Sequence, residues 1–284
     1  MKPIVYCNGE FVEEQSAKVS IFDRGFLFGD GVYEVVPVVN GKLIDKFEFL
    51  QRLERSLYEL ELEWPCSQLE YVAMLETLIA RNKLVEGSVY TQVTRGVAPR
   101  DFAFLDNTPT TCVAFTSAKP YLNSPLVETG VEVITVEDLR WKRRDIKSIA
   151  LLAQCLAKQE SRKQGCYESW MLEGGFITEG SSSTAYIVKN NTIITRPKSN
   201  DVLPGIRRHV LLELAGGKGI KVELQAFTLD EVLAADEAFL SSATTLVLPV
   251  VKVDGILIGD GKPGSMTLKL RQLYVERIKK QAGL

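Results

Sequence analysis

The sequence has very little histidine, because His209 is the only one among 284 residues. A single imidazole excludes a serine–histidine–aspartate hydrolase triad and any metal site built from several histidines, unless His209 acts alone. We therefore expect no metal ion. If the chain is an enzyme, its proton transfers must use lysine, tyrosine, aspartate or glutamate.

Cysteine is also sparse and scattered. The five cysteines are odd in number and contain no Cys-x-x-Cys pair, so we expect neither a disulfide framework nor a zinc site, and a reducing cytoplasm fits. No apolar run approaches the ~20 residues that span a bilayer, and the first residues lack the apolar stretch of a signal peptide. The net charge of −2 gives no reason to expect a nucleic-acid or membrane partner.

The patterns that are present predict an α+β fold. Asn8-Gly9 and Asn40-Gly41 each lie between apolar runs and predict β-hairpins. Helices are predicted from about 45, with Asp45 and Glu48 as a capping pair, and from Thr228, with Glu231 as its partner. We expect a smaller N-terminal domain over 1–118, a linker over 119–123 and a larger β-rich domain over 124–284.

Lys147 and Glu179 form the most informative pair. Lys147 follows a strand-like stretch and precedes Ile149, Leu152 and Leu156 at helical spacing, which predicts a helix start. A lysine held at a buried point can lose its proton and become a nucleophile. Alone, both residues would usually be solvated surface charges. Together they are the minimum that holds a pyridine-ring aldehyde cofactor.

Five blocks covering nearly the whole chain carry a family resemblance. In chain order they are FDRGFLFGDGVYEVV, TRGVAPR, DIKSIALLAQCLAKQE, TEGSSSTAYIV and SSATTLVLPVVKVDG. They resemble the fold-type IV pyridoxal-phosphate enzymes, most closely the D-amino-acid aminotransferases. The resemblance implies a barrel-like larger domain, a pyridoxal 5'-phosphate cofactor in the cleft between the two domains, and a homodimer.

The resemblance also implies cofactor-binding residues. Lys147 would bind the cofactor covalently and move the substrate proton, and Glu179 would keep the ring nitrogen protonated. Leu203 is expected against the ring and Ser182 in a nearby hydrogen bond. The cations Arg140, Lys142, Arg143 and Arg144 are expected to be mostly solvated, with some adding positive charge near Lys147.

The cofactor phosphate requires hydrogen-bond donors. Arg52 stands where the family keeps a phosphate-binding arginine. Ile206 and Arg207 begin a predicted helix whose N–H groups attract phosphate. Ala243 replaces the family's threonine, so we expect a backbone contact from Ala243 and a hydroxyl contact from Thr244.

The substrate carboxylate is expected to meet Tyr33, in VYE, and Arg100, which the family contributes from the neighbouring subunit. Tyr90 is a plausible second hydroxyl. The family's histidine two residues after the arginine is Phe102 here, and phenylalanine cannot donate a hydrogen bond. This departure would weaken the binding of small D-amino acids or shift the preference towards bulkier, apolar substrates or amines.

The resemblance implies transfer of an amino group from a D-amino acid, such as D-alanine or D-glutamate, to a 2-oxo acid such as 2-oxoglutarate by ping-pong kinetics. A branched-chain L-transaminase, an aminodeoxychorismate lyase and an (R)-selective amine transaminase share the fold and stay open. A binding protein without catalysis is disfavoured, because it would need none of Lys147, Glu179, Arg52 and Tyr33. A nucleotide-dependent oxidoreductase is disfavoured, because no Gly-x-Gly-x-x-Gly follows a strand.

Overall fold

The computed structural model describes residues 2–105, 107–120 and 122–284. The chain forms two compact units. The first contains Met1–Pro120, Ile146–Ala150 and Ile278–Leu284, and the second contains Tyr121–Asp145 and Leu151–Arg277. The predicted limits of 1–118 and 124–284 differ from this division, because the segment that carries Lys147 adds to a strand of the first unit.

The first unit is built on a six-stranded sheet in the order β2-β1-β6-β5-β3-β4. Its strands are β1 (Ile4–Cys7), β2 (Glu10–Glu13), β3 (Gly31–Val39), β4 (Lys42–Leu43), β5 (Glu86–Thr94) and β6 (Thr111–Ala118). Both predicted hairpins are confirmed: β1 pairs with β2 and β3 with β4. Asn8, Gly9, Asn40 and Gly41 all have positive φ, as type I′ turns require.

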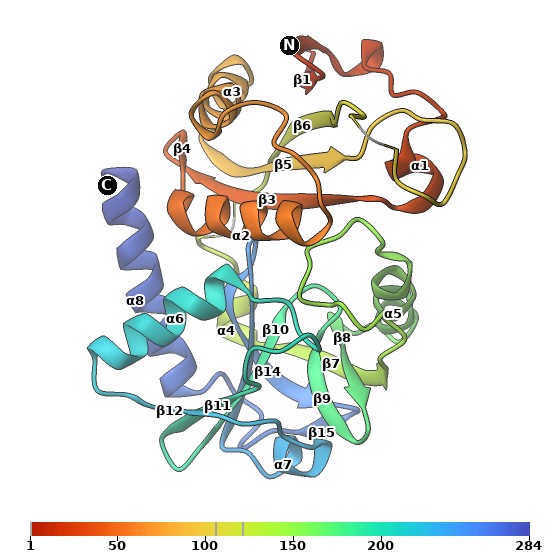
Figure 1. The fold of residues 1–284 in the computed structure, drawn as a ribbon. Helices are drawn as coiled ribbons and strands as arrows, with labels where there is room; N and C mark the ends of the chain where they lie inside the picture. Colours follow the sequence, from red (N-terminus) through yellow and green to blue (C-terminus); the bar gives the residue numbers. More distant parts are fainter. Residues whose placement is uncertain (1, 106, 121) are drawn as a thin grey trace. The chain divides into compact units, whose positions relative to one another are not determined.

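Two helices cover one face of this sheet. The unit's helices are η1 (Glu14–Ser16), α1 (Arg24–Phe28), α2 (Lys46–Glu59) and α3 (Gln68–Arg81). Figure 1 shows α2 running along β3. The Tyr71 hydroxyl of α3 bonds the Thr91 hydroxyl of β5 at 2.5 Å, so α3 lies on the same face. The opposite face of β3 and β5 is left to other side chains, including Tyr33 and Tyr90.

The predicted capping of α2 is wrong, whereas that of α7 is right. Asp45 has a φ of 51° and its side chain caps nothing; it accepts a hydrogen bond from Gln281 instead. A positive φ turns the Asp45 side chain away from the first N–H groups of α2. The Thr228 and Glu231 capping box before α7 (Leu229–Leu233) is present.

The second unit contains a nine-stranded mixed sheet in the order β12-β11-β10-β13-β14-β7-β8-β9, with β15 beside β14. The strands are β7 (Val131–Glu137), β8 (Glu168–Glu173), β9 (Phe176–Gly180), β10 (Thr184–Lys189), β11 (Thr192–Thr195), β12 (Lys221–Leu224), β13 (Glu237–Ser242), β14 (Leu246–Val253) and β15 (Ile256–Leu257). A tight turn joins β9 to β10, and Gly180 N donates to Ser183 O across it at 2.8 Å. β9, at one end of the sheet order, therefore lies beside β10, which is third from the other end, so the sheet curls as a barrel-like sheet does.

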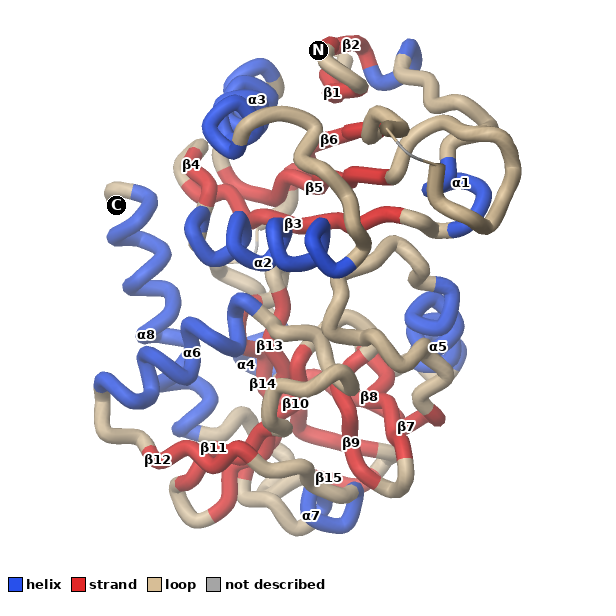
Figure 2. Tube along the Cα trace, in the orientation of Figure 1, coloured by secondary structure: helices blue, strands red, loops and turns tan. Residues whose placement is uncertain are grey.

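Helices complete the second unit: α4 (Leu126–Thr129), α5 (Leu152–Lys163), α6 (Ile206–Gly217), α7 and α8 (Ser265–Ala282), whose last turns belong to the first unit. Trp170, Phe227 and Leu248 are central to the apolar core. The Arg207 side chain of α6 contacts Tyr274 of α8. Figures 1 and 2 show α6 beside α8. None of the helices in the described part of the chain has both the length and the apolar character to cross a membrane.

The predicted helix start at Lys147 is wrong. Residues 146–150 are not helical, and α5 begins at Leu152. Leu152 is 75% exposed and Leu156 is 56% exposed, so their spacing does not mark a core face. The helix buries Ala157 and Ser161 instead, and Ala157 O accepts a hydrogen bond from the Ser169 hydroxyl of β8. Small residues allow α5 to approach the sheet closely.

Candidate active site

Lys147 lies on the edge of the sheet in the first unit. Ser148 pairs with Val32 in an antiparallel bridge, Tyr33 N donates to Lys147 O at 3.0 Å, and Lys147 N donates to the Ser56 hydroxyl at 3.3 Å. Lys147 is thus opposite Tyr33, so their side chains emerge on one face. The Lys147 Nζ lies 4.1 Å from the centroid of the Tyr33 ring.

An aromatic row extends from Tyr33 across the sheet. The Tyr33 and Tyr90 rings stack at 5.5 Å, and Tyr90 stacks on Phe115 at 4.7 Å. The Tyr90 hydroxyl donates to Gln92 Oε1 at 2.8 Å. Burial, with a smaller effect of Tyr33, raises the pKa of Tyr90 to about 12. Tyr90 therefore stays protonated around neutral pH, and its hydroxyl would have to turn from Gln92 to donate to a ligand beside Tyr33.

Arg52 makes a forked ion pair behind this face. Its Nε donates to Glu34 Oε1 and its Nη2 to Glu34 Oε2, both at 2.7 Å. The Glu34 side chain is fully buried and that of Arg52 is 9% exposed. Two parallel bonds fix the plane of the guanidinium. The structure thus gives Arg52 a defined orientation and a carboxylate partner that sequence reasoning missed.

Arg100 and Phe102 lie on the loop after β5. The Arg100 guanidinium is 5.6 Å from the centroid of the Phe28 ring and 5.7 Å from that of Phe102. Phe102 is 76% exposed. The structure therefore brings Arg100 together with Phe28, a residue of α1 that the sequence had not indicated.

Glu179 is buried beside polar partners in the second unit. It lies on β9 and is buried; Arg140 Nη1 donates to its Oε1, and Leu203 N donates to both oxygens, at 3.1 and 3.2 Å. Burial raises the pKa of the Glu179 carboxyl, although Arg140 and Leu203 oppose the shift. Arg140 also donates to Asp138 through Nε and Nη2, at 2.9 and 2.7 Å. The negative charge of Asp138 offsets part of the effect of Arg140 and so raises the pKa of Glu179.

The cations near Lys147 in sequence each have a carboxylate partner. Arg144 and Lys142 both donate to Glu173, and Arg143 donates to Asp145. The hydrogen bonds from Arg144 and Lys142 lower the pKa of Glu173 to about 2. The expectation that these cations are mostly solvated is wrong for Arg140 and Arg144, whose side chains are 5% and 1% exposed, but Lys142 and Arg143 are 80% and 38% exposed.

The serine turn after Glu179 is organised by Glu168, which sequence reasoning missed. Glu168 Oε1 accepts from the Ser181 hydroxyl at 3.2 Å and from the Ser182 N–H and hydroxyl at 2.8 and 2.6 Å; the Ser183 hydroxyl donates to Oε2. A buried carboxylate thus receives four donors from one turn. Glu168 lies on the preceding β8, and no local spacing connects it with the serines.

The residues expected at the phosphate lie at a helix start and a turn. The predicted helix start is confirmed, since α6 begins at Ile206 and its N-cap, Gly205, supplies no side-chain cap. The Arg207 side chain is buried and donates to the Tyr274 hydroxyl, so this residue would offer its backbone N–H. Ala243 and Thr244 form the turn between β13 and β14. Such backbone N–H groups suit an anion.

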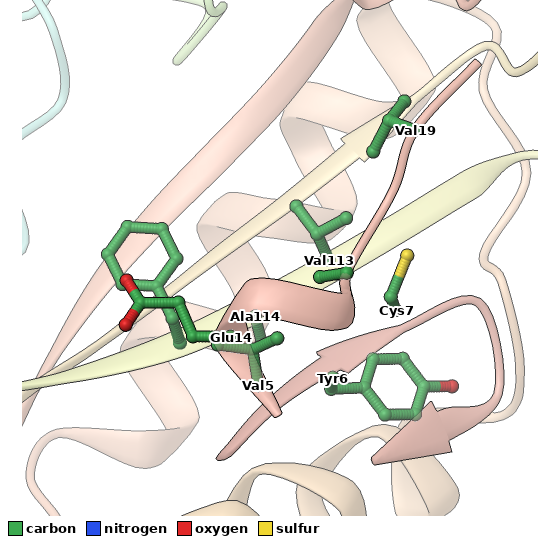
Figure 3. A pocket seen from close by; sticks show the side chains of 9 residues that line it. Val5, Tyr6, Cys7, Glu14, Val19, Val113 and Ala114 are labelled. Carbon is green, nitrogen blue, oxygen red and sulfur yellow. The ribbon is translucent and has the colours of Figure 1, made fainter. Parts of the chain in front are cut away.

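A cavity of about 240 Å³ lies elsewhere in the first unit (Figure 3). It is lined by Val5, Tyr6, Cys7, Glu14, Ala17, Val19, Val113, Ala114 and Phe115. Its walls are largely apolar and include none of the residues discussed above except Phe115. The candidate site residues therefore lie outside this cavity.

Comparison with known proteins identifies the family. Residues 31–253 match the model of amino-transferase class IV. The chain is a class IV aminotransferase. This aminotransferase is similar to the "D-alanine aminotransferase" of Listeria monocytogenes serotype 4b (strain F2365), with 42% identity over 282 residues, 98% of this chain and 97% of the relative. It is 40% identical to the "D-alanine aminotransferase" of Staphylococcus aureus (strain N315) over 277 residues, 96% and 97% of the two chains.

A solved structure supports the fold of the aminotransferase. The branched-chain amino acid aminotransferase of Escherichia coli matches with a TM-score of 0.93 and 24% identity over 99% of this chain and 96% of that one. The predicted α+β, fold-type IV architecture is thus confirmed. Membership of the family makes the chain a pyridoxal-phosphate-dependent enzyme.

The residues of the aminotransferase fit its cofactor. Lys147 offers an amine without a carboxylate or hydrogen-bond partner among the described residues, Glu179 offers a buried carboxylate, and α6 offers an uncapped N-terminus. When bound, pyridoxal phosphate supplies an electron-withdrawing ring that makes the substrate Cα–H acidic. The chain itself must hold that ring and move the proton.

Proposed function

We propose that this aminotransferase transfers the amino group of a D-amino acid, such as D-alanine or D-glutamate, to a 2-oxo acid such as 2-oxoglutarate. The observation that carries the proposal is the Lys147 amine, held at 4.1 Å over the Tyr33 ring on a face that also carries Tyr90. A base and two hydroxyls on one surface suit an amino acid. The D-preference is supported by the two relatives at 42% and 40% identity.

Lys147 is the proposed base. Its flexible stem allows the amine to take the proton from the substrate Cα and return it to the cofactor carbon. Its carbonyl accepts a hydrogen bond from Tyr33 N of β3, so the backbone is fixed while the side chain can move the amine. Positioned proton transfer of this kind contributes about 10²–10⁴-fold to rate.

Glu179 is the proposed partner of the pyridine nitrogen. Arg140 and Leu203 N–H orient its carboxylate, and burial keeps the carboxylate basic. It would therefore hold the ring nitrogen protonated throughout the reaction.

The remaining cofactor contacts are proposed from these positions. Leu203 would lie against the ring and Ser182, held by Glu168, would hydrogen-bond close by. The phosphate would be bound by the residues Arg52, Ile206, Arg207, Ala243 and Thr244, the last four from the helix start and the turn.

The substrate carboxylate is proposed to meet the hydroxyls of Tyr33 and Tyr90 and the guanidinium of Arg100. Because Phe102 replaces a hydrogen-bonding histidine, an (R)-amine transaminase is the second candidate. Values of kcat/KM for D-alanine, L-leucine and (R)-1-phenylethylamine with 2-oxoglutarate decide between them. We expect D-alanine to be preferred by at least about tenfold; preference for L-leucine or the amine would overturn the proposal.

We propose that the enzyme is a homodimer. Large apolar side chains are exposed on α1 and the segments beside it, and gathered apolar surface of this kind marks protein contacts. They are Ile21, Phe22, Phe26, Val97, Phe102 and Phe104. Light scattering should give twice the mass of 31.6 kDa, and Phe26→Lys should shift it towards the monomer. An active monomer would contradict this proposal. A cytoplasmic location remains a prediction.

A further inference from the structure

A buried arginine outside the proposed catalytic residues binds the backbone of the loop that carries Arg100. Arg24 is the first residue of α1 and is 3% exposed. Its Nη1 donates to Asp101 O at 2.5 Å and to Ala103 O at 3.2 Å, and its Nη2 donates to Phe102 O at 3.3 Å. One guanidinium thus holds the carbonyls of the three residues that follow Arg100.

Arg24 is itself fixed by a carboxylate that it shares. Its Nε and that of Arg95 both donate to Asp30 Oδ2 at 2.8 Å. Arg95 also lies 3.5 Å from the centroid of the Phe104 ring. The two cations therefore fasten the loop through its backbone and through a side chain, although Phe102 and Phe104 are exposed.

The other end of α1 meets the side chain of Arg100. The ring centroids of Phe102 and of Phe28, the last residue of α1, lie 5.5 Å apart, and both rings contact the Arg100 guanidinium. Figure 2 shows the loop after β5 passing close to α1. One short helix thus holds the loop backbone at its first residue and the Arg100 guanidinium at its last.

We propose that Arg24 is a positioning residue for Arg100, and that Phe28 and Phe102 form an aromatic pair against one side of its guanidinium. In this arrangement Phe102 serves Arg100 through cation–π attraction instead of binding the substrate carboxylate. The inference rests on the proposed function, in which Arg100 binds a carboxylate. It makes α1 a determinant of the KM for substrates that carry one.

A double-mutant cycle tests this inference. Arg24→Lys keeps the charge but loses the fork that holds three carbonyls. We expect it to raise the KM for D-alanine about tenfold with little change in kcat, and to have almost no further effect in an Arg100→Gln background, because residues that act through one another are not additive. An undiminished effect in that background would overturn the proposal.

Two controls separate the possible failures. Phe102→Leu keeps an apolar side chain on the face proposed for the dimer, and it should raise the same KM about two- to fivefold, again only when Arg100 is present. No change, or an equal change without Arg100, would refute the role of the aromatic pair. If Arg100→Gln alone leaves the KM for D-alanine unchanged, the carboxylate role of Arg100 in the proposed function fails. Thermal unfolding and the visible cofactor absorption confirm that each variant is folded and loaded.

Discussion

Lys147 in the first unit is fixed by its backbone, whereas Glu179 in the second unit is fixed by its side chain. The Lys147 backbone forms hydrogen bonds with β3 and Ser56, and its amine lies over the Tyr33 ring with no hydrogen-bond or carboxylate partner among the described residues. The Glu179 carboxylate has Arg140 and the Leu203 N–H as partners. This difference fits the proposed roles, because a base that moves a proton needs freedom, whereas a carboxylate that holds a constant charge needs fixed partners.

The largest expected effect is on Lys147. Lys147→Ala should reduce kcat about 10⁴-fold, because no other base replaces a positioned amine. The matched control is Lys163→Ala, at an exposed lysine paired with Glu160 on α5. Steady-state transamination with D-alanine measures both. A Lys147→Ala enzyme within tenfold of the parent would show that the freely held amine is not the base.

Breaking the ion pair between Arg52 and Glu34 should have a large effect on the free energy of unfolding. Arg52→Met leaves the buried Glu34 carboxylate unpaired and should lower the free energy of unfolding by about 3–5 kcal/mol. Arg55→Met, on the same helix but exposed, should cost little. Denaturant unfolding of the cofactor-free proteins compares them.

The double variant Arg52→Met with Glu34→Gln separates folding from phosphate binding. It should regain most of the stability, because a neutral amide replaces the buried charge. Its affinity for pyridoxal phosphate should stay low. Recovery of both properties would mean that Arg52 serves only Glu34.

Glu179→Gln should reduce kcat by about 10²–10³-fold, because a neutral amide cannot keep the ring nitrogen protonated. Cofactor affinity should change much less, since the amide keeps the shape of the carboxylate. Equilibrium dialysis and kcat together test this. Loss of the cofactor with unchanged kcat at saturation would assign Glu179 to binding alone.

Replacing Arg140 should change the pH profile. Burial already raises the pKa of Glu179, so activity should fall as pH drops through that value and protonates the carboxylate. Arg140→Gln removes the opposing cation, raises the pKa further and should move the acid limb of kcat to higher pH, with a larger loss at about pH 6 than at about pH 8. Arg143→Gln, which loses a pair with Asp145, should leave the limb in place. An unmoved limb for Arg140→Gln would contradict the proposed control of Glu179.

The sequence predicted the elements of the fold well where the signals are local. Both Asn-Gly hairpins, the Thr228 capping box and the helix start at Ile206 are correct, because turns and caps depend on adjacent residues. It failed for Lys147, whose apolar neighbours imitate a helix but whose backbone pairs with a distant strand. Register across a sheet edge leaves no mark in local spacing.

The candidate site likewise contains residues that the sequence could indicate and partners that it could not. The positions of Lys147 and Glu179 could be proposed from the sequence by resemblance. Their partners could not: Glu34, Arg140 and Glu168 reach their contacts through tertiary packing that brings separate strands together. Charged residues that look like solvated surface in the sequence proved to be buried pairs, as buried charges must be.

The visible absorption of the loaded enzyme during titration with D-alanine, with L-leucine in parallel, tests whether the enzyme is a D-amino-acid transaminase that uses Lys147. We expect D-alanine to bleach the band of the Lys147-bound cofactor and L-leucine to leave it unchanged. Bleaching by L-leucine alone would contradict the proposed specificity, and the absence of any band after adding pyridoxal phosphate would contradict the role of Lys147.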